Sequence, residues 1–264
     1  MKANSGNKSH SNNESVDTQH QNKSILSKQA VDQLRKQAAI LLNKKQASDS
    51  QNLISQVIKS EHSNSLDQCL LASAYLQQGN LREGIKHFLI ALQDNPNILI
   101  AHYNLGKAYS QIGESARARE HYESAISLDP KHFGSLVNLS ISLNASGERE
   151  RALELAKKAV ELRPNSAEAY RNLGKFYQEG GSYQEALESF VKDITIKPDY
   201  VAGWESIGFL TRLRGHASRS TEFFLEALKF SPNNHSLHLN LSLAYCDSYK
   251  ADESLRHARI ALDM

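Results

Sequence analysis

The chain has 264 residues, of which 40% are hydrophobic, and a formal net charge of +2. The hydrophobic content is typical of a folded protein, and so small a net charge gives no reason to expect nucleic acid as a partner. Cys69 and Cys246 lie far apart in the sequence, which excludes a disulfide framework and fits a reducing compartment.

Residues 1–25 are rich in Asn, Ser, Gln, His and Lys and hold few residues that could enter a core. This composition predicts a disordered polar tail. The segment has no apolar stretch of the kind found in a secretory signal. No apolar run in the chain approaches the roughly 20 residues that are needed to cross a membrane. We therefore expect a cytoplasmic protein with no membrane partner.

Residues 26–264 are expected to form one array of repeats, because helix-breaking residues recur in them every 34 residues. The prolines are Pro96, Pro130, Pro164, Pro198 and Pro232, and glycines precede them by 17 residues at Gly79, Gly113, Gly147, Gly181 and Gly215. This spacing predicts a repeat of two short helices, with a turn at the glycine and a stop at the proline. Seven repeats result, starting at Val31, Ser65, Leu99, Phe133, Ala167, Val201 and His235.

The third repeat shows why each helix needs a partner. His102 (by its ring), Leu105, Gly106 and Tyr109 share one face of its first helix, at the spacing i, i+3, i+4, i+7. A second helix carries Ala118, Tyr122, Ala125 and Ile126 on one face. Neither helix could bury its apolar stripe alone, so each is expected to pack on the other and on the next repeat.

This pattern resembles the tetratricopeptide repeat (TPR) family over about 230 residues. The family has a small residue at the eighth place, and the chain has Ala38, Ala72, Gly106, Ser140, Gly174, Gly208 and Ser242 there. The eleventh place is large and apolar, as in Leu41, Tyr75, Tyr109, Leu143, Tyr177 and Tyr245. The twentieth is small and the twenty-fourth is often aromatic, as in Phe88, Tyr122, Phe190 and Phe224. The resemblance implies an all-α fold, a right-handed TPR superhelix.

The chain departs from the family pattern at a few places. The first repeat has Lys45 and His62 where others have the turn glycine and the proline, so we interpret it as a divergent N-terminal capping repeat. Thr211 replaces the usual aromatic residue in the sixth repeat. Asp193 stands where most other repeats have alanine, and a carboxylate at a packed site needs a partner or water. A hydrogen-bonded structural Asp193 and a regulatory or binding Asp193 both remain open.

The resemblance also implies a ligand-binding concave face made by the first helices, with contacts from the second, fifth, sixth, ninth, twelfth and thirteenth places. The sixth place is occupied by Asn104, Asn138, Asn172, Ser206 and Asn240. An asparagine ladder of this kind resembles the one in the TPR region of O-linked N-acetylglucosamine transferases, and amides can bind a peptide backbone whatever its side chains. A local role of these asparagines between helices is an equally good interpretation.

Lys107 in the third repeat, beside Tyr103, and Arg171 and Lys175 in the fifth form a modest basic patch on the predicted groove. They could receive an acidic segment or a carboxylate, but Glu168, Glu179, Glu205 and Asp247 oppose them, so charge selection should be weak. The arrangement by which other TPR domains hold the C-terminal carboxylate of cytosolic heat-shock chaperones does not occur. The residues after Arg171 and Lys175 at the relevant places are Ser206, Ser236 and Asn240.

No catalytic constellation is present in the sequence, and we expect neither an enzyme nor a cofactor. His235 and His238 lack a carboxylate or cysteine at ligand spacing, so no metal site is predicted. The two cysteines have no basic neighbours that would make a reactive thiolate. There is no phosphate-binding glycine loop.

The C-terminal end of the array lacks the polar capping helix that such arrays commonly have. We expect Ala258, Ala261 and Leu262 to be at least partly uncovered, and self-association through this uncapped repeat is one hypothesis. The predicted function is a scaffold that binds an extended peptide or partner segment in the concave groove. The alternative is a substrate-recruiting region of a larger enzyme, such as a glycosyltransferase or sulfotransferase, with catalysis outside this chain.

Overall fold

The computed structural model describes residues 26–264, so the polar tail predicted for residues 1–25 lies outside the described residues. The regular elements of the described part are 14 α-helices. In chain order they are α1 (Lys28–Asn43), α2 (Ala47–Ile58), α3 (Ser65–Gln77), α4 (Leu81–Asp94), α5 (Leu99–Gln111), α6 (Ser115–Leu128), α7 (Phe133–Ala145), α8 (Arg149–Leu162), α9 (Ala167–Glu179), α10 (Tyr183–Ile196), α11 (Val201–Leu213), α12 (Ala217–Phe230), α13 (His235–Asp247) and α14 (Ala251–Leu262).

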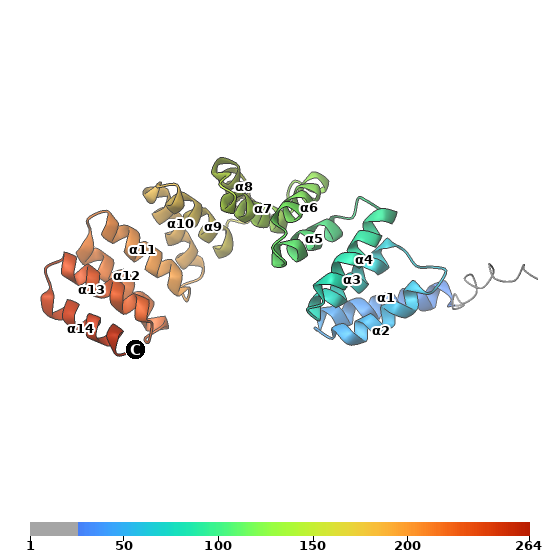
Figure 1. Cartoon of the computed structure of the whole chain (residues 1–264), viewed down its shortest axis with the longest axis horizontal. Coiled ribbons are helices and arrows are strands. Elements are labelled where there is room, and N and C mark those ends of the chain that lie inside the picture. Colours follow the sequence, from blue (N-terminus) through green and yellow to red (C-terminus); the bar gives the residue numbers. More distant parts are fainter. Residues whose placement is uncertain (1–25) are drawn as a thin grey trace, which may run out of the picture. The chain divides into compact units, whose positions relative to one another are not determined.

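The helices follow one another as seven helix–turn–helix repeats, which confirms the all-α fold and the repeat number. Pairs such as α3 with α4 and α13 with α14 can be followed in Figure 1. The first helices of the second to seventh repeats begin at Ser65, Leu99, Phe133, Ala167, Val201 and His235. In the first repeat α1 begins at Lys28, three residues before the predicted start. The reason is a cap that the repeat frame did not reveal: the Ser27 side chain accepts a hydrogen bond from the Ala30 amide.

The turn inside each repeat has one conformation throughout. The fifteenth residue has a positive φ in all seven repeats, between 60° and 86°. The next residue donates its amide hydrogen to the carbonyl five residues back, for example Ser182 N to Tyr177 O at 2.9 Å. This bond closes the helix end in a Schellman motif, which glycine favours because it has no Cβ. Lys45 in the first repeat and Tyr249 in the seventh adopt the conformation without being glycine, both at φ 60°.

Small residues at the eighth place allow the two helices of a repeat to approach closely. A Cβ added to Gly174 would lie 2.9 Å from Cε1 of Phe190, and one added to Gly208 would lie 2.7 Å from Cε1 of Phe224. Both phenylalanines are fully buried on the second helix of the same repeat. The aromatic ring of the second helix therefore occupies the space that a larger first-helix residue would need.

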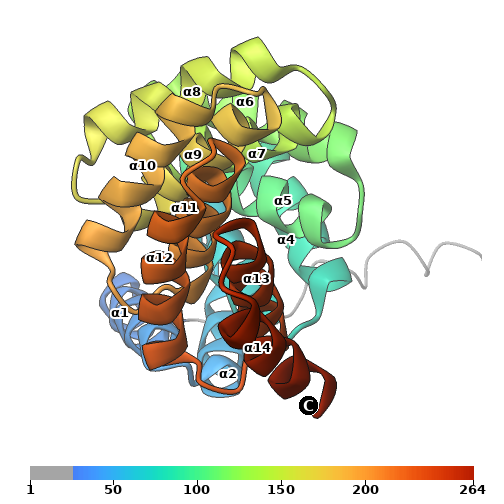
Figure 2. The same cartoon turned by 90° about the vertical axis from the view of Figure 1, so that its left-hand side faces the viewer.

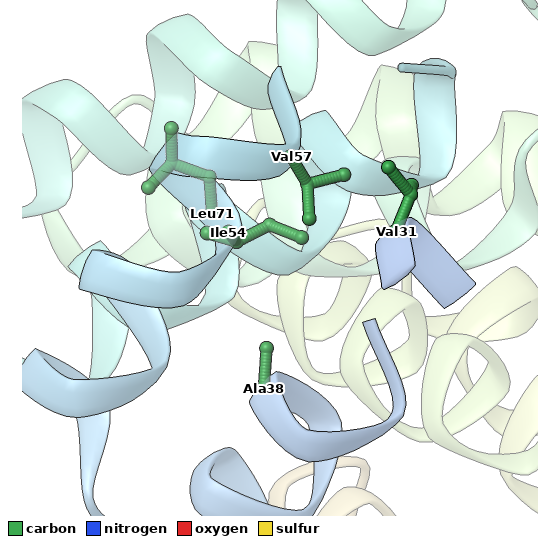
Figure 3. Packing of buried hydrophobic residues seen from close by; sticks show 5 residues of the cluster. All are labelled: Val31, Ala38, Ile54, Val57 and Leu71. Atoms are coloured by element: carbon green, nitrogen blue, oxygen red, sulfur yellow. The ribbon is translucent and has the colours of Figure 1, made fainter. Parts of the chain in front are cut away.

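The chain forms two compact parts, which meet at Ala108 and Tyr109 within α5; we call them the N-terminal and C-terminal segments and describe each by itself. In the N-terminal segment, Ile54 and Val57 of α2 pack with Val31 and Ala38 of α1 and with Leu71 of α3, as Figure 3 shows. This small core explains why the divergent first repeat keeps its fold. Its second helix supplies apolar residues in the predicted frame although the turn glycine is missing.

A buried ion pair joins the first two repeats of this segment. Asp67 is fully buried on α3, and Arg35 of α1 binds both of its carboxylate oxygens, at 2.7 and 2.8 Å. The same carboxylate accepts the amide hydrogen of Asn64, and the Asn64 side chain accepts the Asp67 amide in return. Asp67 thus combines a capping box with an inter-helix ion pair. These hydrogen bonds and the charge of Arg35 offset the free-energy cost of burying its carboxylate.

In the C-terminal segment the second helices α8, α10 and α12 each pack between their own first helix and the first helix of the next repeat. The first helices α11 and α13 also contact each other, as seen in Figure 2. A recurrent hydrogen bond joins consecutive repeats. The ring nitrogens of Trp204 and His238, at the fourth place, donate to the carbonyl oxygens of Pro198 and Pro232, at 2.7 and 3.0 Å. The prolines that end the second helices thereby hold the start of the next repeat.

The last helix differs in part from the sequence prediction. Leu262 is 84% exposed and Ala258 is half-buried, as expected, but the prediction that Ala261 is uncovered is wrong, because Ala261 is only 4% exposed. Ala261 occupies the twenty-seventh place, and Ala91, Ala159 and Ala227 are buried at the same place. Packing of α14 on α13 therefore covers Ala261 whatever follows in the array.

Candidate functional site

The candidate site in the C-terminal segment is a face made by the first helices α7, α9, α11 and α13. Along α9, Asn172, Lys175 and Glu179 fall on one side, because residues three, four and seven apart in a helix share a face. The equivalent places on the other three helices carry Asn138, Ser206 and Asn240 at the sixth place of the repeat. We call this surface the first-helix face.

Hydrogen bonds between neighbouring first helices run across this face with a spacing of 35 residues. Asn144 on α7 donates to Glu179 on α9 at 2.6 Å, and Arg212 on α11 binds Asp247 on α13 at 2.8 Å. About two turns further toward the helix start, Asn240 donates to Glu205 at 2.8 Å. Three of the four acidic residues expected to oppose a basic patch, Glu179, Glu205 and Asp247, therefore bind side chains of the adjacent repeat.

The asparagines of the predicted ladder are in different states. The Asn240 amide is bound to Glu205, which stands at the fifth place of the preceding repeat. The corresponding residue before Asn172 is the apolar Val137, and the buried Nδ2 atom of Asn172 has no hydrogen-bond partner among the described residues. The serine that interrupts the ladder, Ser206, uses its hydroxyl on the Ala202 carbonyl of its own helix at 2.8 Å. Asn240 therefore fits the local role between helices, whereas Asn172 fits ligand contact.

Three buried side-chain atoms in the described part of the chain lack a hydrogen-bond partner: Asn144 Oδ1, Asn172 Nδ2 and Arg212 Nε. All three belong to first helices and stand at the sixth or twelfth place of a repeat, which are places where the TPR resemblance implies ligand contacts. Each side chain is half-buried, so part of it reaches the surface. A buried polar atom left without a partner costs about 1–3 kcal/mol, which a ligand could recover by supplying one.

Arg171 is held by an ion pair with the buried Asp193. Its guanidinium binds both carboxylate oxygens, at 3.1 and 3.2 Å, and lies 3.5 Å from the centre of the Tyr200 ring. Asp193 itself is fully buried on α10. Burial raises the pKa of the Asp193 carboxyl, whereas Arg171 and, less strongly, Lys197 and Lys175 oppose the rise. The partner that the sequence required for Asp193 is thus Arg171, one of the residues predicted to line the groove.

The remaining predicted groove residues are at or near the surface. Lys175 is exposed on α9 and Asn138 is half-buried on α7. In the N-terminal segment, Asn104 is half-buried on α5, and the ammonium of the exposed Lys107 lies 5.6 Å from the centre of the Tyr103 ring. The structure thus groups Tyr103 with Lys107 and Arg171 with Asp193. Ligand contact by these residues stays a prediction.

The described residues contain no group of three or more His, Cys, Asp and Glu side chains that could hold a metal ion. Both cysteines are free thiols. Burial, and less strongly the neighbouring Asp67, raise the pKa of the Cys69 thiol to about 11, so Cys69 is protonated at neutral pH. No helix in the described range 26–264 has the length and hydropathy to cross a bilayer.

Comparison with known families gives three matches, each to a model described as a tetratricopeptide repeat. They cover residues 69–133, 134–163 and 155–188. The chain belongs to the TPR family. No curated protein matches the TPR sequence significantly.

Solved structures show the same TPR fold. A TPR protein from Parabacteroides merdae ATCC 43184 is 18% identical, with a TM-score of 0.64, and the match covers 89% of this chain and 93% of that one. MamA is 25% identical with a TM-score of 0.59, over 61% of this chain and 95% of its own. YrrB, described as a TPR protein with an unusual peptide-binding site, is 16% identical with a TM-score of 0.60, over 67% and 91%.

The bonds between adjacent first helices were not among the features predicted from the sequence. A detectable signal exists, because Asn144 and Glu179, like Arg212 and Asp247, are polar pairs separated by one TPR length plus one residue. That spacing places the twelfth place of one repeat next to the thirteenth place of the following one. The three atoms without partners carry no comparable signal: Asn172 Nδ2 depends on the apolar Val137 one repeat back, and the other two belong to side chains that are bound through another of their atoms.

Proposed function

We propose that this TPR array is a protein-interaction scaffold that binds an extended polypeptide segment along its first-helix face. The observation that carries the proposal is the location of Asn144 Oδ1, Asn172 Nδ2 and Arg212 Nε, the buried atoms without partners in the described residues. They stand on three successive first helices, α7, α9 and α11. An extended peptide offers a carbonyl and an amide at each residue, which matches a face with both donors and acceptors.

The proposed contacts follow from the chemistry of each atom. Asn172 Nδ2 and Arg212 Nε donate to peptide carbonyl oxygens, while Asn144 Oδ1 accepts from a peptide amide. Small rotations of the three half-buried side chains bring these atoms toward the ligand. Because the contacts are to the backbone, the peptide side chains contribute less to selection, and the exposed Lys175 adds a preference for an acidic residue near α9.

The other residues predicted to line the groove contribute secondary contacts or support in this proposal. Asn138 on α7 is a further backbone contact, whereas Asn240 contributes through its carbonyl, since its amide is bound to Glu205. Arg171 supports the face by holding Asp193. Tyr103, Asn104 and Lys107 are the corresponding contacts proposed for the N-terminal segment. The peptide-binding site named for YrrB supports the class of ligand, since that protein has the same fold.

The test is selection of linear peptides from a random library, followed by calorimetric titration of the best binder. We compare the wild-type chain with the double variant Asn138→Ala/Asn172→Ala. Each lost hydrogen bond removes about 0.5–1.5 kcal/mol, so the double variant should bind roughly tenfold more weakly. Circular dichroism establishes that the variant keeps its helices.

The matched control is Asn165→Ala/Asn233→Ala, two exposed asparagines between repeats. Its affinity for the selected peptide should equal that of the wild type. A library that gives no binder, or a binder with the same affinity for the double variant and the wild type, contradicts the proposal.

A further inference from the structure

The twenty-third place of the repeat, on the second helix, holds a bulky residue in every repeat except the fifth. The series is Leu53, His87, His121, Leu155, Ser189, Phe223 and His257. In the first and fourth repeats the leucine packs against an apolar core cluster. Ser189 is the one small residue in the series. Its hydroxyl is bound to the Glu185 carbonyl of its own helix at 2.8 Å.

Where the twenty-third residue is histidine, its ring stacks on the tyrosine at the eleventh place. The ring centres are 5.4 Å apart for Tyr75 and His87, 5.5 Å for Tyr109 and His121, and 5.7 Å for Tyr245 and His257. The ring planes are within 22° of parallel in all three pairs. The same stacked contact therefore recurs in three repeats, in both segments of the chain.

The fifth repeat has the tyrosine, Tyr177, but no ring to stack on it. In its place the structure has an open cleft of about 520 Å³, with Ser189 in its lining. Tyr170, Leu173 and Tyr177 of α9 line one side, and Leu187 and Val191 of α10 line the other. The volume lies in the range of about 300–1,000 Å³ that is usual for ligand pockets.

This cleft is separate from the first-helix face. Successive residues of a helix are about 100° apart around its axis, so Tyr170 and Tyr177 lie about 160° and 140° from Asn172. The cleft is therefore on the opposite side of α9 from the proposed peptide-binding face, and a ligand in one leaves the other open.

The charges around the cleft favour a neutral occupant. Glu185 and Glu188 line it, but so does Lys192, and the ammonium of Lys157 lies 5.7 Å from the centre of the Tyr177 ring. Two carboxylates and two ammonium groups cancel. A cation would gain little net attraction, whereas a neutral ring would gain apolar burial and a stacked contact with tyrosine. The exposed, flexible Lys157 side chain can move aside to admit it.

We propose that this cleft is a second binding site, which takes an aromatic side chain projecting from a partner polypeptide. The aromatic ring stacks on Tyr177 in the way that His87 stacks on Tyr75 within the second repeat. The site is distinct from the first-helix face, where the proposed contacts are to the peptide backbone. Because the cleft contacts a side chain of the partner, it would add a preference for particular partner sequences.

The test is an NMR titration of the full chain with methyl groups of leucine and valine labelled with carbon-13. The probes are N-acetyl-tryptophanamide, N-acetyl-phenylalaninamide, N-acetyl-leucinamide and N-acetyl-argininamide. The two aromatic amides should shift the methyl signals of Leu173, Leu187 and Val191 saturably, with roughly millimolar affinity as expected for so small a ligand. Absence of such shifts, or equal shifts with leucinamide or argininamide, overturns the proposal.

Variants show whether the effect belongs to the vacated ring position. Ser189→His should fill the cleft from within and weaken the binding of the aromatic amides at least tenfold. Ser127→His is the control, because Ser127 makes the same kind of hydroxyl bond to its own helix at an exposed place, and its binding should be unchanged. Unchanged binding to folded Ser189→His would overturn the proposal.

Two further variants cover a failure of Ser189→His to fold and separate this site from the first. Val191→Ser changes a cleft residue that is 41% exposed and should weaken binding severalfold without endangering the fold. Asn138→Ala/Asn172→Ala should bind the aromatic amides as the wild type does. Full binding by Val191→Ser, or a loss in the asparagine variant, contradicts an independent aromatic site at this cleft.

Discussion

At the scale of single residues, the pair formed by Arg171 and Asp193 shows that a sequence outlier can have a structural cause. Asp193 occupies a place that is alanine in most repeats, and burial raises the pKa of its carboxyl although Arg171 opposes the rise. Because its folded pKa lies above its unfolded one, ionised Asp193 lowers stability at neutral pH. Arg171 limits this cost. Removal of Arg171 and removal of Asp193 should therefore change the free energy of unfolding by different amounts.

Replacing Arg171 by alanine should lower the free energy of unfolding by about 3 kcal/mol, because it leaves a fully buried carboxylate without its partner. Asp193→Ala restores the usual residue and leaves an arginine that is part-exposed and stacked on Tyr200. Its effect should be within about 1 kcal/mol of zero. Urea denaturation of both variants measures the difference, and equal losses of stability would refute this asymmetry.

A histidine pair in the last repeat should make its stability depend on pH. His238 Nε2 donates to the Pro232 carbonyl, and Nδ1 of His238 accepts the Nδ1 hydrogen of His257, at 2.9 Å. Burial, followed by His238 and Arg256, lowers the pKa of His257. With a folded pKa below the unfolded value of about 6.5, stability is fully present above that pH and is lost as the pH falls.

Hydrogen exchange of the α13 and α14 amides at pH 7.5 and pH 5.0 should therefore show weaker protection at the lower pH. His257→Phe keeps a ring on Tyr245 but does not titrate, so its protection should change less between the two pH values. His87 in the second repeat, whose pKa is also lowered by burial, remains in both proteins as an internal reference. A pH effect of the same size in α13 and α14 of the variant would exclude His257 as its source.

At the scale of helices and turns, most of the fold could be predicted from the sequence. The 34-residue spacing gave the frame, and six of the seven first helices begin at the residues expected from it. Periodicity could not reveal the earlier start of α1, which depends on the Ser27 cap. Nor could it reveal the turn at Tyr249, because the left-handed conformation there is imposed by the two packed helices on a residue that does not favour it.

Tyr249→Gly should stabilise the last repeat by about 0.5–1 kcal/mol. A non-glycine residue in the left-handed region costs about 1–2 kcal/mol, and glycine offsets this with about 0.5–1 kcal/mol of lost chain entropy. Tyr249 is 98% exposed, so its ring contributes no packing that the substitution would remove. Thermal unfolding of the variant gives the sign, and a decrease in stability would mean that the φ of 60° carries no strain.

The close helix contact in the sixth repeat predicts the opposite effect for a larger residue. Gly208→Val places a branched side chain where a single Cβ would already lie 2.7 Å from the buried Phe224 ring. We expect a loss of about 2–3 kcal/mol, since overpacking forces the ring and the backbone to shift. Gly208→Val/Phe224→Leu should recover part of the loss in urea denaturation. No recovery would place the strain elsewhere.

At the scale of the whole molecule, the repeat frame predicts which residues lie on the first-helix face. It does not predict which hydrogen bonds their side chains make. The places of Asn138, Asn172 and Asn240 follow from the sequence alone. That Asn240 is bound and Asn172 is not depends on Glu205 and Val137, residues 35 positions back in a neighbouring helix. The hydrogen-bonding state of these asparagines therefore depends on pairs of side chains in adjacent repeats, which a single-repeat consensus does not describe.

The most direct test of the proposed function is to locate a bound peptide. A peptide selected against the array, with a photoreactive benzophenone side chain placed in turn at each position, is cross-linked, and the linked residues are identified by mass spectrometry. The account predicts links to α7, α9 and α11 around Asn144, Asn172 and Arg212, at every peptide position that faces the protein. Links confined to the second helices α8, α10 and α12 would contradict it.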